Sequence, residues 1–323
     1  MKTARPPIGN RQSAIGNPLL PLLSRRSFLS TAGAASGLVA SLRAAAAAKP
    51  HHDLALPTVG PLVDVNLNLS RWPLRRLPAD ETPVLVRKLR QCGAVQGWAG
   101  SFDGLLHKDL GAVNARLADE CRRAGRAFLL PFGMVNPMLP DWEEELRRCA
   151  EARRMPGIRL HPNYHGYRLD HPAFARLLQL AAHRRLIVQL ALVMEDERMM
   201  HPLLRVEPVD TAPLAGVVRQ TPGVRLVLLN AMRTLRGQAL RDLIAAGEVY
   251  VEISMLEGVG GLGNLLAQVP VERVLFGSHA PLFYLESALL KLKESPLLPG
   301  QLRAIASGNA RRLSAECGVR SAE

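Results

Sequence analysis

The chain has 323 residues, of which 48% are hydrophobic and 21% charged, and its formal net charge is +13. Six of the positive charges lie in residues 1–48, which contain no acidic residue, so the rest of the chain carries +7. In that remainder, arginine pairs such as Arg147-Arg148 alternate with acids such as Glu143-Glu144-Glu145. This pattern is typical of solvated helix faces, and we expect no nucleic-acid partner.

The first 48 residues have the pattern of an export signal. Arg25-Arg26 precedes a short apolar stretch of small residues, Thr31–Leu42, and an alanine run, Ala44–Ala48. The stretch is too short and too rich in Ala and Gly to hold a stable membrane span. We predict a twin-arginine signal and leader over 1–48, followed by a linker over 49–61. We therefore expect export by the twin-arginine machinery to the periplasm or another extracytoplasmic compartment. A basic leader without function is the alternative.

From residue 62 onward, short apolar runs recur at intervals of about 25–38 residues. Each interval has room for a strand, a loop and a helix, and parallel strands need such a crossover. This predicts one domain, an α/β (β/α)8 TIM barrel over residues 62–317, with a tail over 318–323. The eight predicted strands are Leu62–Asn68, Ala94–Trp98, Ala127–Val135, Gly157–His161, Leu186–Ala191, Val224–Asn230, Val249–Ser254 and Val274–His279.

Apolar positions with helical spacing lie between these strands. They predict helices over Thr82–Cys92, Leu110–Ala124, His171–His183, Glu286–Lys293 and Gln301–Ala315. Two connections are longer than a compact barrel needs. Asn68–Asp80 carries Trp72 and several arginines, which predicts a cationic and aromatic wall at the barrel mouth. Ala191–Pro213 follows the fifth strand, and we expect it to form a lid.

Two further patterns have ordinary explanations. The four cysteines, Cys92, Cys121, Cys149 and Cys317, show no C-x-x-C spacing. Sequence leaves disulfide pairing open, and we expect Cys121 and Cys149 to be buried, inert thiols. Gly258–Gly263 satisfies G-x-G-x-x-G, but neither a full helix nor a suitably placed acid follows it, so we expect a flexible loop instead of a dinucleotide site.

Three segments resemble the amidohydrolase-related family. They are Gly157–Pro162 (GIRLHP), Leu275–Pro281 (LFGSHAP) and the closing Gly308–Leu313 (GNARRL). Together with Asp64–Asn68, the resemblance covers about residues 62–317. It implies a (β/α)8 barrel and metal-assisted hydrolysis or decarboxylation, with the active site at the carboxyl ends of the strands.

The departures from the family concern the metal ligands. The H-x-H pair of the family's first strand corresponds to Asn66 and Asn68, and the sixth-strand histidine to Asn230. The fifth-strand histidine falls near Gln189 or Leu190, and the eighth-strand aspartate is His279. A carboxamide is a weak donor for zinc, so the resemblance does not extend to the metal site, and we predict no metal ligand there. A relocated site for one divalent metal such as zinc, on His161, His279 and Glu252, is an alternative.

We therefore expect a hydrolase, or a decarboxylase, that acts on a small, polar, anionic substrate by acid–base chemistry. By position in the family, His279 would be the general base, and Arg159 would bind the substrate anion through its planar fork. His161 and Glu252 complete the catalytic candidates. The substrate-binding candidates are Asn66, Asn68, Arg71, Tyr164, His165, Gln189 and Asn230. The other reading is a non-catalytic ligand-binding barrel in which the amides form a satisfied polar plug.

Overall fold

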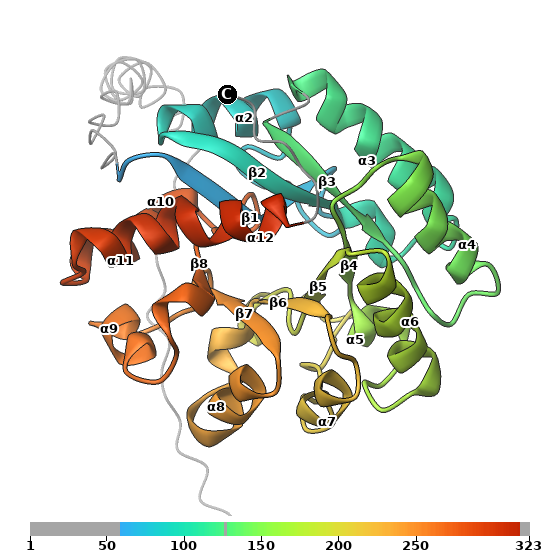
Figure 1. Ribbon diagram of the computed structural model, residues 1–323. Helices are drawn as coiled ribbons and strands as arrows, with labels where there is room; N and C mark the ends of the chain where they lie inside the picture. The colour runs from blue at the N-terminus through green and yellow to red at the C-terminus, as the bar shows by residue number, and fades with distance from the viewer. Residues whose placement is uncertain (1–58, 126–127, 317–323) are drawn as a thin grey trace, which may run out of the picture. The chain divides into compact units, whose positions relative to one another are not determined.

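The structure is a computed structural model that describes residues 59–125 and 128–316. The predicted signal and leader, most of the linker, Cys317 and the tail lie outside these residues. Eight parallel strands follow one another in sequence order around a nearly closed barrel, as predicted (Figure 1). They are β1 (Leu62–Leu69), β2 (Ala94–Ser101), β3 (Leu129–Met134), β4 (Gly157–Leu160), β5 (Ile187–Ala191), β6 (Arg225–Leu229), β7 (Glu248–Glu252) and β8 (Val274–Leu275).

Helices alternate with the strands and form the outer layer (Figure 1). They are α2 (Thr82–Gln91), α3 (Leu110–Gly125), α4 (Trp142–Arg147), α5 (Pro162–His165), α6 (Pro172–His183), α7 (Leu214–Arg219), α8 (Gly237–Ala245), α9 (Gly261–Leu266), α10 (Leu285–Glu294), α11 (Pro299–Arg303) and α12 (Asn309–Ala315). The five predicted helices are all present, although a π-helical turn, Ala304–Gly308, separates α11 from α12. Helix α9, beside the glycine motif, has only six residues, so the full helix of a dinucleotide fold is absent there.

Each predicted strand overlaps an observed one, but the last strand is much shorter than expected. β8 ends at Leu275, and His279 lies beyond it with φ at +59°. Asn230, directly after β6, has φ at +58°. A left-handed backbone is uncommon for residues other than glycine, though histidine and asparagine adopt it more readily than most. It turns the chain at the ends of both strands, and each side chain is buried at that turn.

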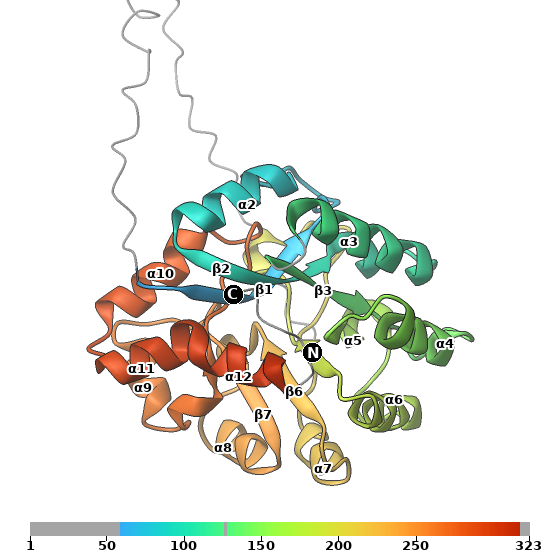
Figure 2. The ribbon, with the colours of Figure 1, turned by 45° about the horizontal axis from the view of Figure 1, so that its top comes forward.

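The barrel is closed between β1 and β8 by few contacts. Val65 N donates to Phe276 O at 3.0 Å, and Asn68 N donates to Ala280 O at 2.9 Å. The C-terminal helices lie beside this seam in both views (Figures 1 and 2). There the Asn309 amide donates to the carbonyls of Val271 at 2.7 Å and Val274 at 2.8 Å. Asn309, which belongs to the Gly308–Leu313 segment of the family resemblance, thus holds the chain in place where it enters β8.

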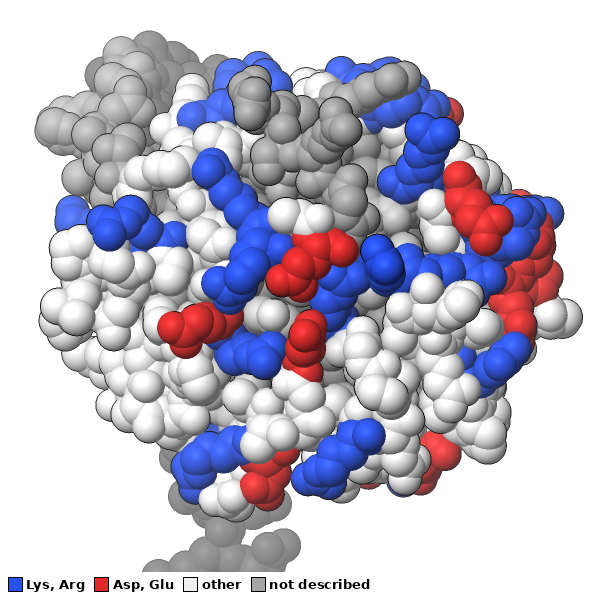
Figure 3. All heavy atoms as spheres, in the orientation of Figure 1, with Lys and Arg blue, Asp and Glu red and all other residues white. Residues whose placement is uncertain are grey.

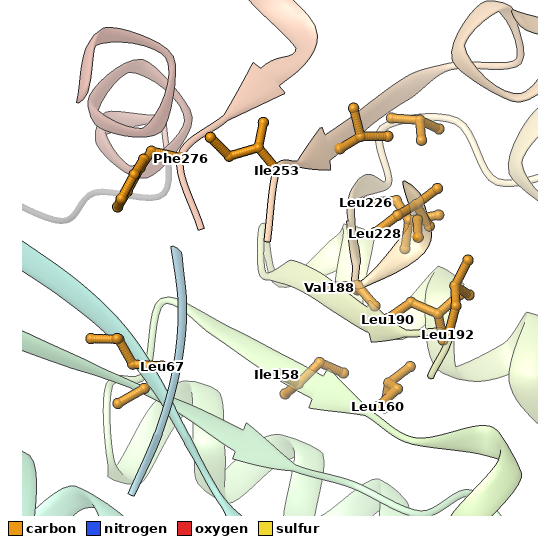
Figure 4. Close-up of a cluster of buried hydrophobic side chains, with 14 of the residues drawn as sticks. Leu67, Ile158, Leu160, Val188, Leu190, Leu192, Leu226, Leu228, Ile253 and Phe276 are labelled. Atoms are coloured by element: carbon orange, nitrogen blue, oxygen red, sulfur yellow. The ribbon is translucent and has the colours of Figure 1, made fainter. Parts of the chain in front are cut away.

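Side chains alternate between two apolar layers, as the period of a strand requires. Figure 4 shows members of the outer layer, in which β4, β5 and β6 contribute Ile158, Val188 and Leu226. An inner cluster fills the barrel and includes Val227 of β6 and Leu313 of α12. Because α12 packs into this inner cluster and Arg225, at the start of β6, pairs with Glu316 at 3.7 Å, α12 covers the amino ends of the strands. The polar strand ends lie at the opposite end.

The three cysteines of the described residues, Cys92, Cys121 and Cys149, are buried and free, as expected for inert thiols. Burial raises the pKa of Cys121 to about 12. Acidic and basic side chains are interspersed on the face shown in Figure 3. Within residues 59–125 and 128–316, no helix is long and apolar enough to cross a membrane.

Gly157 tests how tightly β4 is packed. A Cβ there would overlap the Ile187 carbonyl oxygen and the Phe132 ring, whereas a Cβ at Gly216 in α7 would meet no atom within 4 Å. We expect Gly157→Ala to lower the free energy of unfolding by about 3 kcal/mol, because backbone and core must both shift. Gly216→Ala should raise it by about 0.5–1 kcal/mol through helix propensity. Urea denaturation measures both, and equal effects of the two substitutions would contradict this packing.

Candidate functional site

Seven polar side chains form one hydrogen-bonded group at the carboxyl ends of the strands, and we name this group the polar ring. The ring consists of Asn66, Asn68, Arg159, Gln189, Asn230, Glu252 and His279, none more than 2% exposed. Asn66 Nδ2 donates to Asn230 Oδ1 at 2.8 Å and lies 3.3 Å from Glu252 Oε1. Asn68 joins Arg159 to His279. The structure therefore brings together seven of the residues selected from the sequence.

A β-bulge positions the two asparagines of β1. The register with β2 shifts between Asp64 and Leu67, so β1 carries one extra residue there. Without the bulge, strict alternation would place Val65 and Asn66 on opposite faces. In the structure, Val65 packs in the inner cluster while Asn66 and Asn68 join the polar ring. Bulges beside active sites commonly redirect side chains in this way.

Arg159 is the buried cation of the ring, and its donors are largely used by the protein. Nε donates to Gln189 Oε1 at 2.8 Å, and Nη1 donates to Leu67 O at 2.8 Å and Asn68 Oδ1 at 2.9 Å. Nη2 donates to Trp98 O at 3.2 Å. A guanidinium has five N–H donors, so four are engaged. Burial lowers the pKa of Arg159 to about 9, which still leaves it charged at neutral pH. Its role as an anion clamp stays a prediction.

Glu252 supports the ring through its own hydrogen bonds. Its carboxylate accepts from Asn230 N at 2.6 Å and from the N and Oγ of Ser254 at 2.6 and 2.7 Å. It also lies against Gly277, where any Cβ would overlap it. Arg159 is not among these hydrogen-bond partners. The carboxylate orients the chain after β6 and β7, and a direct catalytic role for it stays a prediction.

His279 has a defined protonation state. Its Nε2 lies 2.8 Å from Met194 O, and a carbonyl oxygen can only accept, so Nε2 carries the proton. Nδ1 is therefore unprotonated, and its neighbour is Asn68 Nδ2 at the long distance of 3.5 Å. Burial lowers the pKa of His279 to about 4, and the Arg159 charge acts in the same direction. At neutral pH, His279 is a neutral imidazole with an available lone pair.

His161 is a second buried imidazole, placed directly after β4. It is 1% exposed, and neither of its ring nitrogens has a hydrogen-bond partner among the described residues. The rings of Tyr164 and His165 each lie 6.4 Å away, centroid to centroid. Burial and the neighbouring His165 and Arg159 lower the pKa of His161 well below its ordinary value. Buried polar atoms rarely lack partners, so these nitrogens mark a place where a ligand can bind.

Two other candidates occupy different surroundings. His165 Nε2 donates to Gly104 O at 3.0 Å, which leaves Nδ1 as the unpaired nitrogen. Arg71 is an exposed residue that pairs with Glu81 at 3.4 Å, and the structure does not bring it to the ring. The arginine of that loop that faces the mouth is Arg75, which pairs with Glu195. Position in the sequence gave no means of distinguishing these two arginines.

Sequence reasoning also missed Asp64. It is fully buried in β1 and accepts hydrogen bonds from the backbone N–H groups of Asn66 and Ser278, each at 3.0 Å. It thus links β1 to the chain that carries His279. Burial raises its pKa to about 7. The sequence did contain one indication, because Asp64 is an acidic residue among the apolar residues that begin the predicted first strand.

The long connection after β5, residues 192–213, covers the polar ring, and we name it the lid. Val193 O accepts from Asn230 Nδ2 at 2.7 Å, and Met194 O accepts from His279. Glu195 then pairs with Arg75 across the mouth. The only regular structure within the lid is a short 3-10 turn, Glu197–Met199. Access to the ring therefore requires the lid to move.

The ring does not suit the divalent metal that the family resemblance implies. Its H-x-H positions carry amides, and the Asn66 amide nitrogen faces Asn230 and Glu252. Within the described ranges, no three His, Cys, Asp or Glu side chains are arranged to hold a metal ion. The alternative set of His161, His279 and Glu252 is accordingly not assembled. Carboxamides are weak donors for such an ion, and the Glu252 carboxylate is engaged by Asn230 and Ser254.

The raised pKa of Asp64 predicts a pH-dependent stability. The folded protein binds this proton more tightly than the unfolded chain, so the stability contributed by protonated Asp64 is lost as pH rises from about 4 to about 7. Asp64→Asn removes the ionisation and keeps an acceptor oxygen. We expect the difference between its free energy of unfolding and that of wild type to increase by about 2 kcal/mol, in favour of the variant, between pH 5 and pH 8.

Denaturant titrations at several pH values measure this difference. Gln91→Ala, at an exposed position of α2, is the control and should give a difference that is flat with pH, because it changes no ionisable group. A flat difference for Asp64→Asn as well would show that its carboxyl is not perturbed.

Comparisons with known proteins agree with this geometry. A family model described as Amidohydrolase matches residues 63–313. No curated protein matches the sequence. Among solved structures, the chain is similar to 2,6-dihydroxybenzoate decarboxylase from Rhizobium, with 16% identity, a TM-score of 0.61, and coverage of 79% of this chain and 99% of that one. It is also similar to 5-carboxyvanillate decarboxylase from Sphingomonas paucimobilis, with 13% identity, a TM-score of 0.60, and coverage of 79% and 99%.

A dihydroxybenzoic acid decarboxylase from Polaromonas sp. JS666, solved with bound manganese, has 13% identity and a TM-score of 0.60, with 79% of this chain and 97% of that one covered. At such identities, these likenesses show the shared fold. The family model spans most of the chain, and it accords with the barrel and with the segments around β1, β4 and β8. The protein belongs to the amidohydrolase family.

Proposed function

We propose that this protein is an acid–base hydrolase that cleaves an ester or lactone bond in a small substrate that also carries a free carboxylate. The observation that carries the proposal is the neutral His279, with its proton fixed on Nε2 and its Nδ1 lone pair available. A neutral imidazole in a buried site is suited to accept a proton from water. Burial also excludes competing solvent once the lid has closed.

The geometry supports the following sequence of events. Nδ1 of His279 accepts a proton from a water molecule while the water oxygen attacks the substrate carbonyl. The negative charge that develops on the carbonyl oxygen is stabilised by amide donors, of which Asn68 Nδ2 is nearest to Nδ1. The imidazolium then returns the proton to the leaving oxygen, so that an acid and an alcohol are formed. His161, whose two ring nitrogens are unpartnered, is the candidate to bind either group.

The lid contributes to this chemistry directly. Met194 O fixes the tautomer of His279 only when the lid lies on the ring. Lid closure would thus complete the base at the same time as it encloses the substrate, a common use of mobile loops. Burial, with the Arg159 charge acting in the same direction, keeps His279 neutral, and the Arg159 charge stabilises negative charge nearby.

Decarboxylation is the second candidate, favoured by the similar solved structures that are decarboxylases of hydroxylated aromatic acids. In that reaction the substrate loses CO2 and the ring carbon gains a proton. The amides of the polar ring would bind the hydroxyl groups. A barrel that binds such acids without converting them is a third outcome, which the activity experiment below identifies.

Activity measurements on His279 variants test the proposal. We expect His279→Gln to lower kcat by about 100-fold or more on the best substrate in a panel of lactones, aryl esters and hydroxybenzoates, because general base catalysis is lost. His183→Gln, an exposed histidine at the end of α6, is the matched control and should leave kcat unchanged. The wild-type rate should fall only as pH drops toward about 4, where His279 becomes protonated.

Acid release and CO2 release, measured separately, distinguish hydrolysis from decarboxylation. Protein refolded with zinc or manganese and then dialysed should show the same activity as protein handled in chelator. Equal rates for wild type and His279→Gln on every compound would remove the enzyme proposal.

We also propose export through the twin-arginine route, supported by Arg25-Arg26 and the small-residue stretch that follows. Replacing both arginines by lysine should keep the protein in the cytoplasm of a host that has this pathway. Cell fractionation and immunoblotting measure the change. Unaltered fractionation of the Arg25→Lys/Arg26→Lys variant would contradict the route.

A further inference from the structure

The proposed function requires a cation that binds the substrate carboxylate, and Arg159 is poorly placed for this. Four of its five donors bind the protein, to β1, β2 and β5. Exchanging these bonds for a substrate would leave buried carbonyl groups without donors, which is costly. A guanidinium whose partner can leave without disturbing the barrel is better suited to the role.

Arg75 meets this condition. It lies on the loop between β1 and α2, its side chain is 34% exposed, and its guanidinium pairs with the Glu195 carboxylate. Glu195 is only 2% exposed, yet it belongs to the lid and not to the barrel. Burial raises the pKa of Glu195, and this effect is larger than the lowering caused by the hydrogen bond from Arg75. The pair therefore joins a fixed cation at the mouth to an anion on a segment that must move.

The surroundings of Glu195 resemble a binding site for a small aromatic acid. Tyr164, which contacts His161, lies near enough that the Glu195 charge contributes to raising its phenol pKa. Trp72 and Phe102 pack edge to face at 5.1 Å in the inner cluster, and Trp72 Nε1 has no partner within the described residues. Trp72, with its unpaired donor, thus lies on the same loop as the Arg75 cation, and Tyr164 lies near Glu195.

A cavity adjoins the lid backbone at this point. It has a volume of about 210 Å3, and its lining includes Val193, Glu195, Arg233 and Thr234. Val193 also places its carbonyl on the polar ring, so the lid residues 193–195 separate the cavity from the ring. An outward displacement of these residues would release Glu195 from Arg75 and open a path from the cavity to the ring.

We propose that Glu195 is an internal substitute for the substrate, and that Arg75 exchanges the Glu195 carboxylate for that of a small aromatic carboxylic acid. This inference rests on the proposed function and names the substrate class of the same site. One carboxylate replaces another on the same guanidinium, so charge is conserved during the exchange. In the closed, ligand-free protein, Glu195 competes with the ligand and holds the lid shut.

Binding of benzoate and of its neutral isostere benzamide tests the exchange without requiring turnover. In Glu195→Gln, Arg75 is no longer paired with a carboxylate, so benzoate should bind about tenfold more tightly than in wild type. Benzamide should change by less than about twofold, because it cannot take the place of an anion. Isothermal titration calorimetry on the full chain gives both dissociation constants.

Three further variants separate the exchange from general loosening of the lid. Asp210→Asn removes another lid carboxylate, which pairs with the exposed Arg168 at 3.6 Å, and should leave both affinities unchanged. Arg75→Gln should abolish the preference for benzoate over benzamide. The Arg75→Gln/Glu195→Gln variant should show no tightening by the second substitution. Circular dichroism and urea denaturation establish that each variant is folded.

Equal tightening of benzoate and benzamide, an unchanged benzoate affinity in Glu195→Gln, or a preference that survives in Arg75→Gln would each overturn the exchange. Failure of the proposed function looks different. In that case the benzoate pattern persists while no compound in the activity panel is converted, which describes a binding protein for aromatic acids. Conversion that depends on His279 without the benzoate pattern would retain the hydrolase and remove Arg75 as its anion site.

Discussion

The buried guanidinium of Arg159 is the interaction on which the site depends. It ties β4 to the backbone of β1 and β2 and, through Gln189, to β5; Gln189 in turn donates to Val65 O at 2.7 Å. A single charge thus fixes the relative positions of four strand ends. Removing such a charge from water is expensive unless each donor finds an acceptor. Here four donors do, and the carboxylates of Asp64 and Glu252 act on it from nearby.

This arrangement has a direct effect on the chemistry available. Burial lowers the pKa of both His161 and His279, and the charge that organises the strand ends acts in the same direction. The site therefore contains neutral imidazoles, neutral amides, the Glu252 carboxylate and the Arg159 cation. Such a set can accept protons and stabilise anions. It differs from a metal centre in its donors, since amides replace the nitrogen and carboxylate ligands that a dication needs. The absence of the family's metal ligands is therefore consistent with the presence of side chains suited to acid–base chemistry.

Much of the fold could be predicted from the sequence, because apolar runs at regular spacing and strand-end polarity report on burial directly. The same reasoning found the seven members of the polar ring. It could not find how they are used. That Arg159 is occupied, that Glu252 binds Ser254 rather than Arg159, and that β8 stops before His279 all follow from contacts between distant segments. Asp64 was missed because a buried acid is recognised only when its backbone partners are known.

The contact between Met194 and His279 couples access to reactivity. In the closed protein, one carbonyl oxygen decides which ring nitrogen holds the hydrogen. Once that oxygen withdraws, the imidazole is free to adopt either tautomer, and only one of them presents a lone pair to the interior. An open barrel would thus admit molecules while remaining largely inert toward them. If the protein is the hydrolase proposed above, its reactivity is confined to the enclosed state, and labile esters outside the barrel escape indiscriminate attack.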